Sequence, residues 1–310
     1  MMSSELFPIG YGTWAIGGDS YGKTDDKESL YALNLAIEKG VNFFDTADLY
    51  GKGHSEKLIG DVIKSKDRSK LYIASKVGYD LLDPQIQNFT SKYIYKSIDD
   101  SLLRLKTDYL DVYFLHSPNI NCLIEERTFE TMLKLKDAGK IKKIGISVRH
   151  IDDVLPVLKK HEYEVVQFIY NLLDQRAKEN GVLEYCLKNN IVTVARVPLC
   201  FGFLTCKYKH NTTFTHNDQR SRWSMEQRNK WINTSLKIKN VFCRHGYNES
   251  MASLALKFCC DTKGITVTIP GMKTEKQVME NLKTLDMPMF SNTLLEELDT
   301  LYKQNSCIPL

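Results

Sequence analysis

The sequence lacks the features that mark membrane and secreted proteins. No apolar run approaches the roughly 18 residues of a spanning helix. The first ten residues, MMSSELFPIG, contain no basic region followed by an apolar core, which is the pattern of a secretory signal. We therefore expect a cytoplasmic protein with no membrane partner.

Paired cysteine spacings are also missing. The eight cysteines are scattered, with no C-x-x-C and no histidine nearby at metal-ligand spacing. In a chain of this length without a signal, such cysteines are expected to be reduced thiols, mostly in the core. We predict no metal site. The cysteines are Cys122, Cys186, Cys200, Cys206, Cys243, Cys259, Cys260 and Cys307.

The chain also has little excess of one sign of charge over the other. The net charge is only +4, which by itself does not indicate a nucleic-acid partner. What is present is ordinary globular composition, with 43% hydrophobic and 26% charged residues. A length of 310 residues fits one α/β barrel domain.

Short apolar runs alternate with helix-like segments about eight times along the chain. The runs are nearly continuously apolar, as buried parallel strands are. Eight such units most simply close into a (β/α)8 TIM barrel, so we predict one α/β domain over residues 1–310. An open doubly wound sheet is the alternative. The expected strands are residues 7–12, 41–45, 70–76, 109–116, 143–147, 164–169, 191–196 and 265–269.

The helical segments carry recognisable faces and boundaries. Leu30, Leu33 and Ile37 share one face of the first, and Gly40 is placed to end it. Ser55 is placed to cap the second. The others are expected at residues 91–105, 124–140, 151–162, 181–190, 249–260 and 274–285, with a last one at 292–303.

One interval departs from this alternation. Residues 205–245 are polar and contain nine Lys or Arg against Asp218 and Glu226, a local charge of +7. We interpret them as a partly helical insertion after the seventh strand. They are expected either to cover a bound ligand or to offer a surface to a protein partner.

Four groups that can ionise or donate a proton leave consecutive strands. Asp45 ends the second strand, and Tyr50 follows in its loop. Lys76 ends the third and His116 the fourth. Barrel active sites lie at the C-terminal ends of the strands, so we expect these four side chains to converge. A lysine closing an apolar strand needs a partner, and Asp45 is the nearest candidate.

This set suits proton donation to a carbonyl oxygen. A neighbouring ammonium group lowers the pKa of a phenol, and a histidine can share its proton. We therefore expect Lys76 to lower the pKa of Tyr50 and to make it a general acid.

The sequence resembles the aldo-keto reductase superfamily over about residues 5–285. FFDTADLYG resembles its second-strand motif, and ASKVG, LHSP, KKIGIS, ARVPLCFGFLT and IPGMKTEKQVMEN resemble other family segments in the same order. The resemblance implies an NADPH-dependent carbonyl reductase with Asp45, Tyr50, Lys76 and His116 as its catalytic residues.

The resemblance also implies a cofactor site. Ser147 and Gln167 would hold the nicotinamide carboxamide, and Lys273 would contact the 2′-phosphate of NADPH. Free amides at the start of the last barrel helix favour phosphate independently. The implied cofactor-binding residues are Gly12, Thr13, Trp14, Asp45, Ser147, Gln167, Arg196, Pro198, Leu199, Gly202, Leu204, Lys207, Gly271, Lys273, Thr274, Gln277, Glu280 and Asn281.

Two positions depart from the family pattern. Val148 stands where the family often has Asn. Arg196 stands where many members place an aromatic residue under the nicotinamide. A guanidinium group can stack there, but it adds a positive charge. These differences affect specificity, and the sequence does not identify the small-molecule carbonyl substrate.

Two alternatives remain open. Lys76 could form a Schiff base, as in barrel aldolases. The chain could also be a regulatory NADPH-binding protein, because potassium-channel beta subunits resemble the same family.

Overall fold

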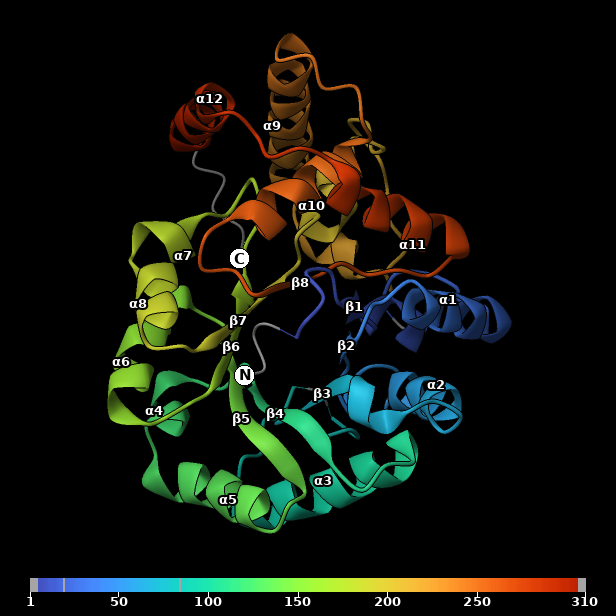
Figure 1. Ribbon diagram of the computed structural model, residues 1–310, viewed down its shortest axis with the longest axis vertical. Helices are drawn as coiled ribbons and strands as arrows, with labels where there is room; N and C mark the ends of the chain where they lie inside the picture. Colours follow the sequence, from blue (N-terminus) through green and yellow to red (C-terminus); the bar gives the residue numbers. More distant parts are fainter. Residues whose placement is uncertain (1–4, 19, 84, 306–310) are drawn as a thin grey trace.

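Eight parallel strands form a barrel in the computed structural model, which describes residues 5–18, 20–83 and 85–305 (Figure 1). Each strand pairs with the next along the chain. The first and last segments are joined by parallel bridges from Ile9 to Thr268 and from Gly12 to Gly271. This closure confirms the predicted TIM barrel and excludes the open sheet. The strands are β1 Tyr11–Gly12, β2 Phe43–Asp45, β3 Tyr72–Val77, β4 Leu110–His116, β5 Ile141–Ser147, β6 Val165–Ile169, β7 Val192–Arg196 and β8 Val267–Ile269.

The barrel interior is filled by side chains. Its inner core contains Phe43, Val112, Phe114, Val194 and Val267, all less than 1% exposed. A second, larger apolar core lies between the strands and the helices. Because the interior is packed, a ligand can enter only beyond the strand ends.

Strand register brings the predicted site residues to one end of the barrel. Gly12 pairs with Asp45, and His116 pairs with Ser147. Ser147 in turn pairs with Gln167. These positions are the last residues of their strands, or close to the last, so their side chains surround the same opening.

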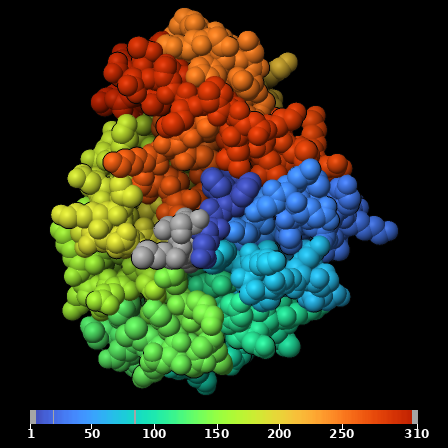
Figure 2. All heavy atoms as spheres, in the orientation of Figure 1, coloured from blue at the N-terminus to red at the C-terminus, as the bar shows by residue number. Residues whose placement is uncertain are grey.

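Helices surround the strands, as the alternation predicts (Figure 1). In Figure 2 the side chains fill the gaps between the ribbons, and α11 lies beside α1. The helices are α1 Asp26–Glu38, α2 His54–Ile63, α3 Ser91–Leu105, α4 Ile120–Leu123, α5 Glu126–Asp137, α6 Val154–Lys160, α7 Arg176–Glu179, α8 Val182–Lys188, α9 Met225–Arg244, α10 Met251–Asp261, α11 Glu275–Leu282 and α12 Asn292–Gln304. No helix among the described residues is both long and apolar enough to cross a membrane.

Helix boundaries confirm one predicted signal and contradict another. Gly40 follows α1 with φ of 95°, the left-handed conformation expected of a glycine stop. Ser55, however, does not cap α2. The cap is Gly53, and the Ser55 hydroxyl donates to Thr13 Oγ1 at 2.6 Å. The prediction was wrong because a buried tertiary hydrogen bond holds this serine inside the helix.

The polar interval 205–245 divides into a covering segment and the helix α9. Trp231, fully buried, anchors α9 to the core. At the far end of α9, Arg244 forms an ion pair with Glu297 of α12, and Lys237 donates to Asn305. Both helices stand outside the ring of barrel helices (Figure 1). Part of the cationic surplus is therefore neutralised or hydrogen-bonded within the protein.

Candidate active site

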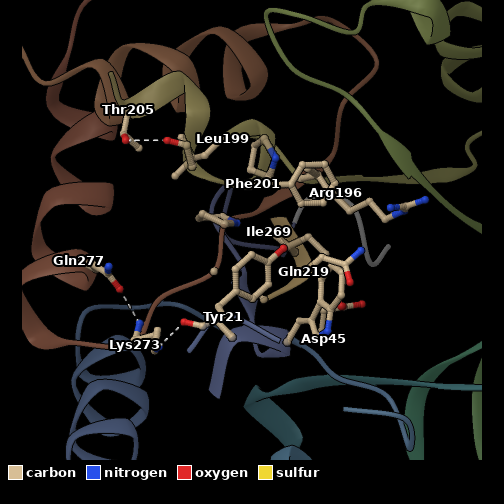
Figure 3. A pocket seen from close by; sticks show the side chains of 18 of the residues that line it. Tyr21, Asp45, Arg196, Leu199, Phe201, Thr205, Gln219, Ile269, Lys273 and Gln277 are labelled. Atoms are coloured by element: carbon tan, nitrogen blue, oxygen red, sulfur yellow. Dashed lines mark hydrogen bonds between the residues drawn. The ribbon is translucent and has the colours of Figure 1, made fainter. Parts of the chain in front are cut away.

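A cavity of about 1030 Å³ lies at the C-terminal ends of the strands. Asp45 and Arg196 lie at one end of it, Lys273 and Gln277 at the other, and Tyr21 lies between (Figure 3). The predicted catalytic side chains thus share a cavity with the predicted phosphate-binding side chains. A ligand that contacts both ends must be elongated.

Lys76 connects the predicted catalytic residues. Its fully buried ammonium group donates to Asp45 Oδ1 at 2.6 Å, to the Thr46 carbonyl at 2.8 Å and to the Tyr50 hydroxyl at 3.1 Å. All three N–H donors are therefore used. Lys76 lies behind the cavity wall, while Asp45 and Tyr50 line the cavity. This geometry lets Lys76 act on Tyr50 but excludes it from direct contact with a ligand in this structure.

His116 lies beside the Tyr50 ring, with ring centroids 6.0 Å apart and nearly perpendicular planes. The Tyr79 ring also packs edge-on against the His116 ring, with the two ring centroids 5.1 Å apart. Burial, with Lys76 and Arg196 nearby, holds the pKa of His116 well below its usual value, so the ring is neutral. Its Nδ1 is buried and has no protein partner among the described residues. A neutral imidazole on the cavity wall can orient a carbonyl oxygen by a hydrogen bond.

Tyr50 does not have the lowered pKa that the sequence led us to expect. Burial, reinforced by the charge of Asp45, raises the pKa of Tyr50 well above its ordinary value, and Arg196 opposes this only in part. The expectation was wrong because removing the phenolate from water outweighs the nearby cations. Tyr50 therefore holds its proton throughout the neutral range, the state that a proton donor requires.

Ser147 and Gln167 form a chain that ends on Asp45. The Ser147 hydroxyl donates to Gln167 Oε1 at 2.9 Å, and Gln167 Nε2 donates to Asp45 Oδ2 at 2.6 Å. Asp45 therefore accepts from Lys76 with one oxygen and from Gln167 with the other. The chain fixes the carboxylate and leaves a row of polar atoms along the cavity wall.

A second buried acid from the same motif lies behind this row. Asp48 is 1% exposed and accepts from the Ser97 hydroxyl at 2.9 Å. Burial and the nearby charge of Glu56 raise the pKa of Asp48 to about 7. The charge of Asp48, behind the predicted catalytic residues, therefore changes near neutral pH.

The far end of the cavity begins where α11 starts. Thr274 caps α11, and its hydroxyl accepts from the Gln277 backbone N–H at 3.2 Å. The Lys273 ammonium group donates to the Tyr21 and Lys23 carbonyls, each at 3.1 Å. An ammonium group has three donors, so one remains for a ligand.

The segment before α9 contacts the loop after β1. The Gln219 backbone N–H donates to the Ser20 carbonyl at 2.7 Å. The Arg220 guanidinium lies 5.3 Å from the centre of the Tyr21 ring and is held by Asp218. Two loops that are distant in sequence thereby form one wall of the cavity.

The loop after β7 is strained. Val197 has φ of 57°, and Cys200 and Phe201 also have positive φ. A β-branched residue seldom adopts this conformation. Asn171 Nδ2 donates to the Val197 carbonyl at 3.0 Å and helps to hold it. The strain lies at the cavity wall, where Val197 and Phe201 line it.

Most of the predicted site residues line the cavity, and three do not. Thr13 and Leu204 are fully buried, and the Thr13 hydroxyl donates to the Asp45 carbonyl. With Lys76 they support the wall from behind. The predicted residues that line the cavity are Gly12, Trp14, Asp45, Tyr50, His116, Ser147, Gln167, Arg196, Pro198, Leu199, Gly202, Lys207, Gly271, Lys273, Thr274, Gln277, Glu280 and Asn281.

Several cavity residues were missed by the sequence analysis. Tyr79 follows Lys76 by three residues, so inspecting the whole loop after the third strand could have found it. Tyr21 comes from an irregular loop, and Gln219 and Arg220 come from a single 3-10 turn, which is too short for periodicity to indicate direction. The others include Leu49, Ser117, Arg149, Phe201, Thr205, Tyr208, Arg222, Met251 and Lys276.

Comparison with known proteins agrees with this geometry. A sequence model described as Aldo/keto reductase family matches residues 8–303. The chain is 34% identical over 281 residues to Aldo-keto reductase YhdN of Bacillus subtilis, covering 88% of this chain and 83% of that protein. It is also 30% identical over 296 residues to the Schizosaccharomyces pombe protein Aldo-keto reductase yakc, whose name includes NADP(+). That match covers 93% of this chain and 86% of the yeast protein.

A solved structure shows the same architecture. The glycerol dehydrogenase AKR11B4 from Gluconobacter oxydans superposes with a TM-score of 0.82 at 26% identity, covering 98% of this chain and 94% of that one.

Proposed function

Because the chain belongs to the aldo/keto reductase family, we propose that it reduces aldehydes or ketones with NADPH and that Tyr50 donates the proton. One observation carries the proposal: the buried Lys76 contacts the Tyr50 hydroxyl at 3.1 Å, and Tyr50 lines the cavity beside a neutral His116. A protonated phenol and a neutral imidazole on one wall suit a carbonyl oxygen that gains negative charge.

The residues of the cavity fit NADPH. The catalytic end offers buried polar atoms without protein partners, His116 Nδ1 and Arg196 Nε. At the other end, Lys207, Lys273 and Lys276 line the wall, and none of them pairs with a carboxylate in the described part of the chain. Cations without a carboxylate partner, beside a helix N-terminus, suit phosphate groups. Ser147 and Gln167 would hold the nicotinamide end.

The chain's own residues then act as follows. His116 orients the carbonyl, and Tyr50 gives its proton to the oxygen. Lys76 and Asp45 hold the phenol in place and stabilise the charge that it leaves. When bound, NADPH supplies the hydride that forms the new C–H bond. The products are an alcohol and NADP⁺, and solvent returns the proton to Tyr50.

Turnover of 4-nitrobenzaldehyde tests this proposal. We expect loss of NADPH absorbance at 340 nm and one alcohol formed per NADPH consumed. Tight NADPH binding without turnover would contradict the proposal and favour a regulatory protein. Covalent trapping of a carbonyl substrate on Lys76 by borohydride would favour the Schiff-base alternative.

Lys273→Ala should weaken NADPH binding selectively. A charge-assisted hydrogen bond to the 2′-phosphate contributes ~1.5–3 kcal/mol, or roughly ten- to a hundred-fold in Kd. NADH lacks this phosphate, so its affinity should change little. Titration of both cofactors into wild type and variant measures the difference. Lys283→Ala, a lysine of the same region outside the cavity lining, is the matched control. Equal losses for NADPH and NADH would show that Lys273 does not contact the phosphate.

The segment 206–224 should become protected when NADPH binds. It lines the cavity through Lys207, Tyr208 and Gln219 and joins the loop after β1 through Ser20. We therefore expect it to cover the cofactor phosphates. Limited trypsin digestion should cut at Lys207, Lys209 and Arg222 more slowly with NADPH present. Cleavage in residues 64–70, between α2 and β3, is the internal control. Unchanged rates in both regions would contradict the covering role.

A further inference from the structure

Arg196 is a cation at the catalytic end that has no carboxylate partner among the described residues. Its Nη2 donates to the Val148 carbonyl at 3.1 Å, and its Nε is buried without a partner. The nearby acids are already used. Asp45 pairs with Lys76 at 2.6 Å, and Asp174 pairs with Arg176 at 2.7 Å.

The catalytic end therefore carries an excess positive charge. Asp45 and Lys76 cancel each other, and Tyr50 and His116 are neutral. Asp48 lies behind them and, with its pKa raised by burial to about 7, carries only part of a negative charge at neutral pH, so Arg196 is not fully compensated. A buried charge without a counter-ion is costly and is seldom retained unless a ligand or function benefits.

The nicotinamide ring must come close to this charge. A hydride donor and the carbonyl carbon it reduces lie about 3–3.5 Å apart before reaction. Because Tyr50 contacts the carbonyl oxygen in the proposed mechanism, the ring lies within a few ångströms of Tyr50. Arg196 lines the cavity at the same end as Asp45 (Figure 3), and Lys76 joins Asp45 to Tyr50 by hydrogen bonds.

We infer that Arg196 makes the site discriminate between the two redox forms of the cofactor, binding neutral dihydronicotinamide in preference to the nicotinamide cation. The inference rests on the proposed function. NADPH and NADP⁺ carry the same phosphates, so the charges at the other end of the cavity act equally on both. Only the ring charge differs, and Arg196 repels it.

The preference affects binding and release. Two unit charges separated by a few ångströms in a partly buried site interact strongly enough to change an equilibrium about tenfold or more. NADP⁺ should therefore leave readily after reduction and should enter poorly for alcohol oxidation. By linkage, each tenfold preference for NADPH raises the two-electron potential of the bound couple by about 30 mV.

Dissociation constants of both forms, measured by quenching of tryptophan fluorescence, test the inference without using turnover. Wild type should bind NADPH at least about tenfold more tightly than NADP⁺. Arg196→Met removes the charge and should bring the ratio of the two constants close to one. Arg196→Lys keeps a charge and should keep most of the preference. Arg127→Met removes an exposed arginine of α5 that does not line the cavity and should leave the ratio intact.

The possible results distinguish a failure of the Arg196 inference from a failure of the proposed reductase function. A wild-type ratio near one, or an Arg196→Met ratio equal to that of wild type, would overturn the inference while leaving the reductase proposal standing. Equal weakening of both forms in the variant would assign Arg196 a purely structural role and would also overturn it. Failure of wild type to bind either form would overturn the proposed function itself. Arg196→Gln is a second neutral variant, so the test does not depend on the folding of one protein.

Discussion

Tyr50→Phe should reduce kcat for carbonyl reduction by about 10²–10⁴-fold, the usual contribution of general acid catalysis. The substitution removes only the hydroxyl. Lys76 keeps its hydrogen bonds to Asp45 and Thr46, and the ring keeps its stacking on Trp14. The fold and the Kd for NADPH should therefore change little.

Steady-state kinetics with 4-nitrobenzaldehyde and a separate NADPH titration measure the two effects. Tyr170→Phe is the matched control, since Tyr170 is a fully buried tyrosine outside the cavity lining whose hydroxyl contacts Thr262. If Tyr50→Phe retains more than a tenth of wild-type turnover, Tyr50 is not the proton donor.

Asp45→Asn should lower the free energy of unfolding by about 3–5 kcal/mol, because it leaves the Lys76 ammonium buried without its counter-ion. The fully buried position of Lys76 gives water no route to replace the carboxylate. Urea denaturation measures the loss. The loss of stability relative to wild type should shrink as pH rises towards 10. Burial already lowers the folded-state pKa of Lys76, and without Asp45 the neutral amine becomes the favoured folded form. The unfolded variant then binds more protons than the folded variant, so its stability rises with pH.

The double variant Asp45→Asn/Lys76→Met provides the control for this prediction. A buried ion pair replaced by neutral groups is often close to neutral for stability, so the double variant should be more stable than Asp45→Asn alone. A single variant within 1 kcal/mol of wild type would show that the pair contributes little.

The barrel and the convergence of the candidate catalytic residues at one end could be predicted from the sequence because both follow from strand pattern. Parallel strands place their C-terminal residues at one opening, so Asp45, Lys76 and His116 had to converge once their strands were identified. The contacts of Lys76 with Asp45 and Tyr50 follow from that convergence.

Other features depend on tertiary geometry that no periodicity encodes. The contact between Gln219 and Ser20 joins a short 3-10 turn to a loop about two hundred positions away. The direction of the Tyr50 pKa shift depends on how far burial outweighs nearby charges, which a list of neighbours does not reveal. Ser55 was assigned to a helix cap because its local pattern permits one, but Thr13 is its partner.

Arg196 is a residue whose importance the sequence showed only in part. Its unusual identity was visible in the sequence, but its lack of a counter-ion was not. That required knowing that Asp45 and Asp174 are both committed to other cations.

A crystal structure of the protein with NADPH and an unreactive carbonyl ligand tests the central claim most directly. The account predicts the nicotinamide ring between Arg196 and Tyr50, the ligand oxygen within hydrogen-bond distance of Tyr50 and His116, and the 2′-phosphate beside Lys273. A cofactor whose nicotinamide lies away from Tyr50, or a carbonyl oxygen bound elsewhere in the cavity, would contradict it.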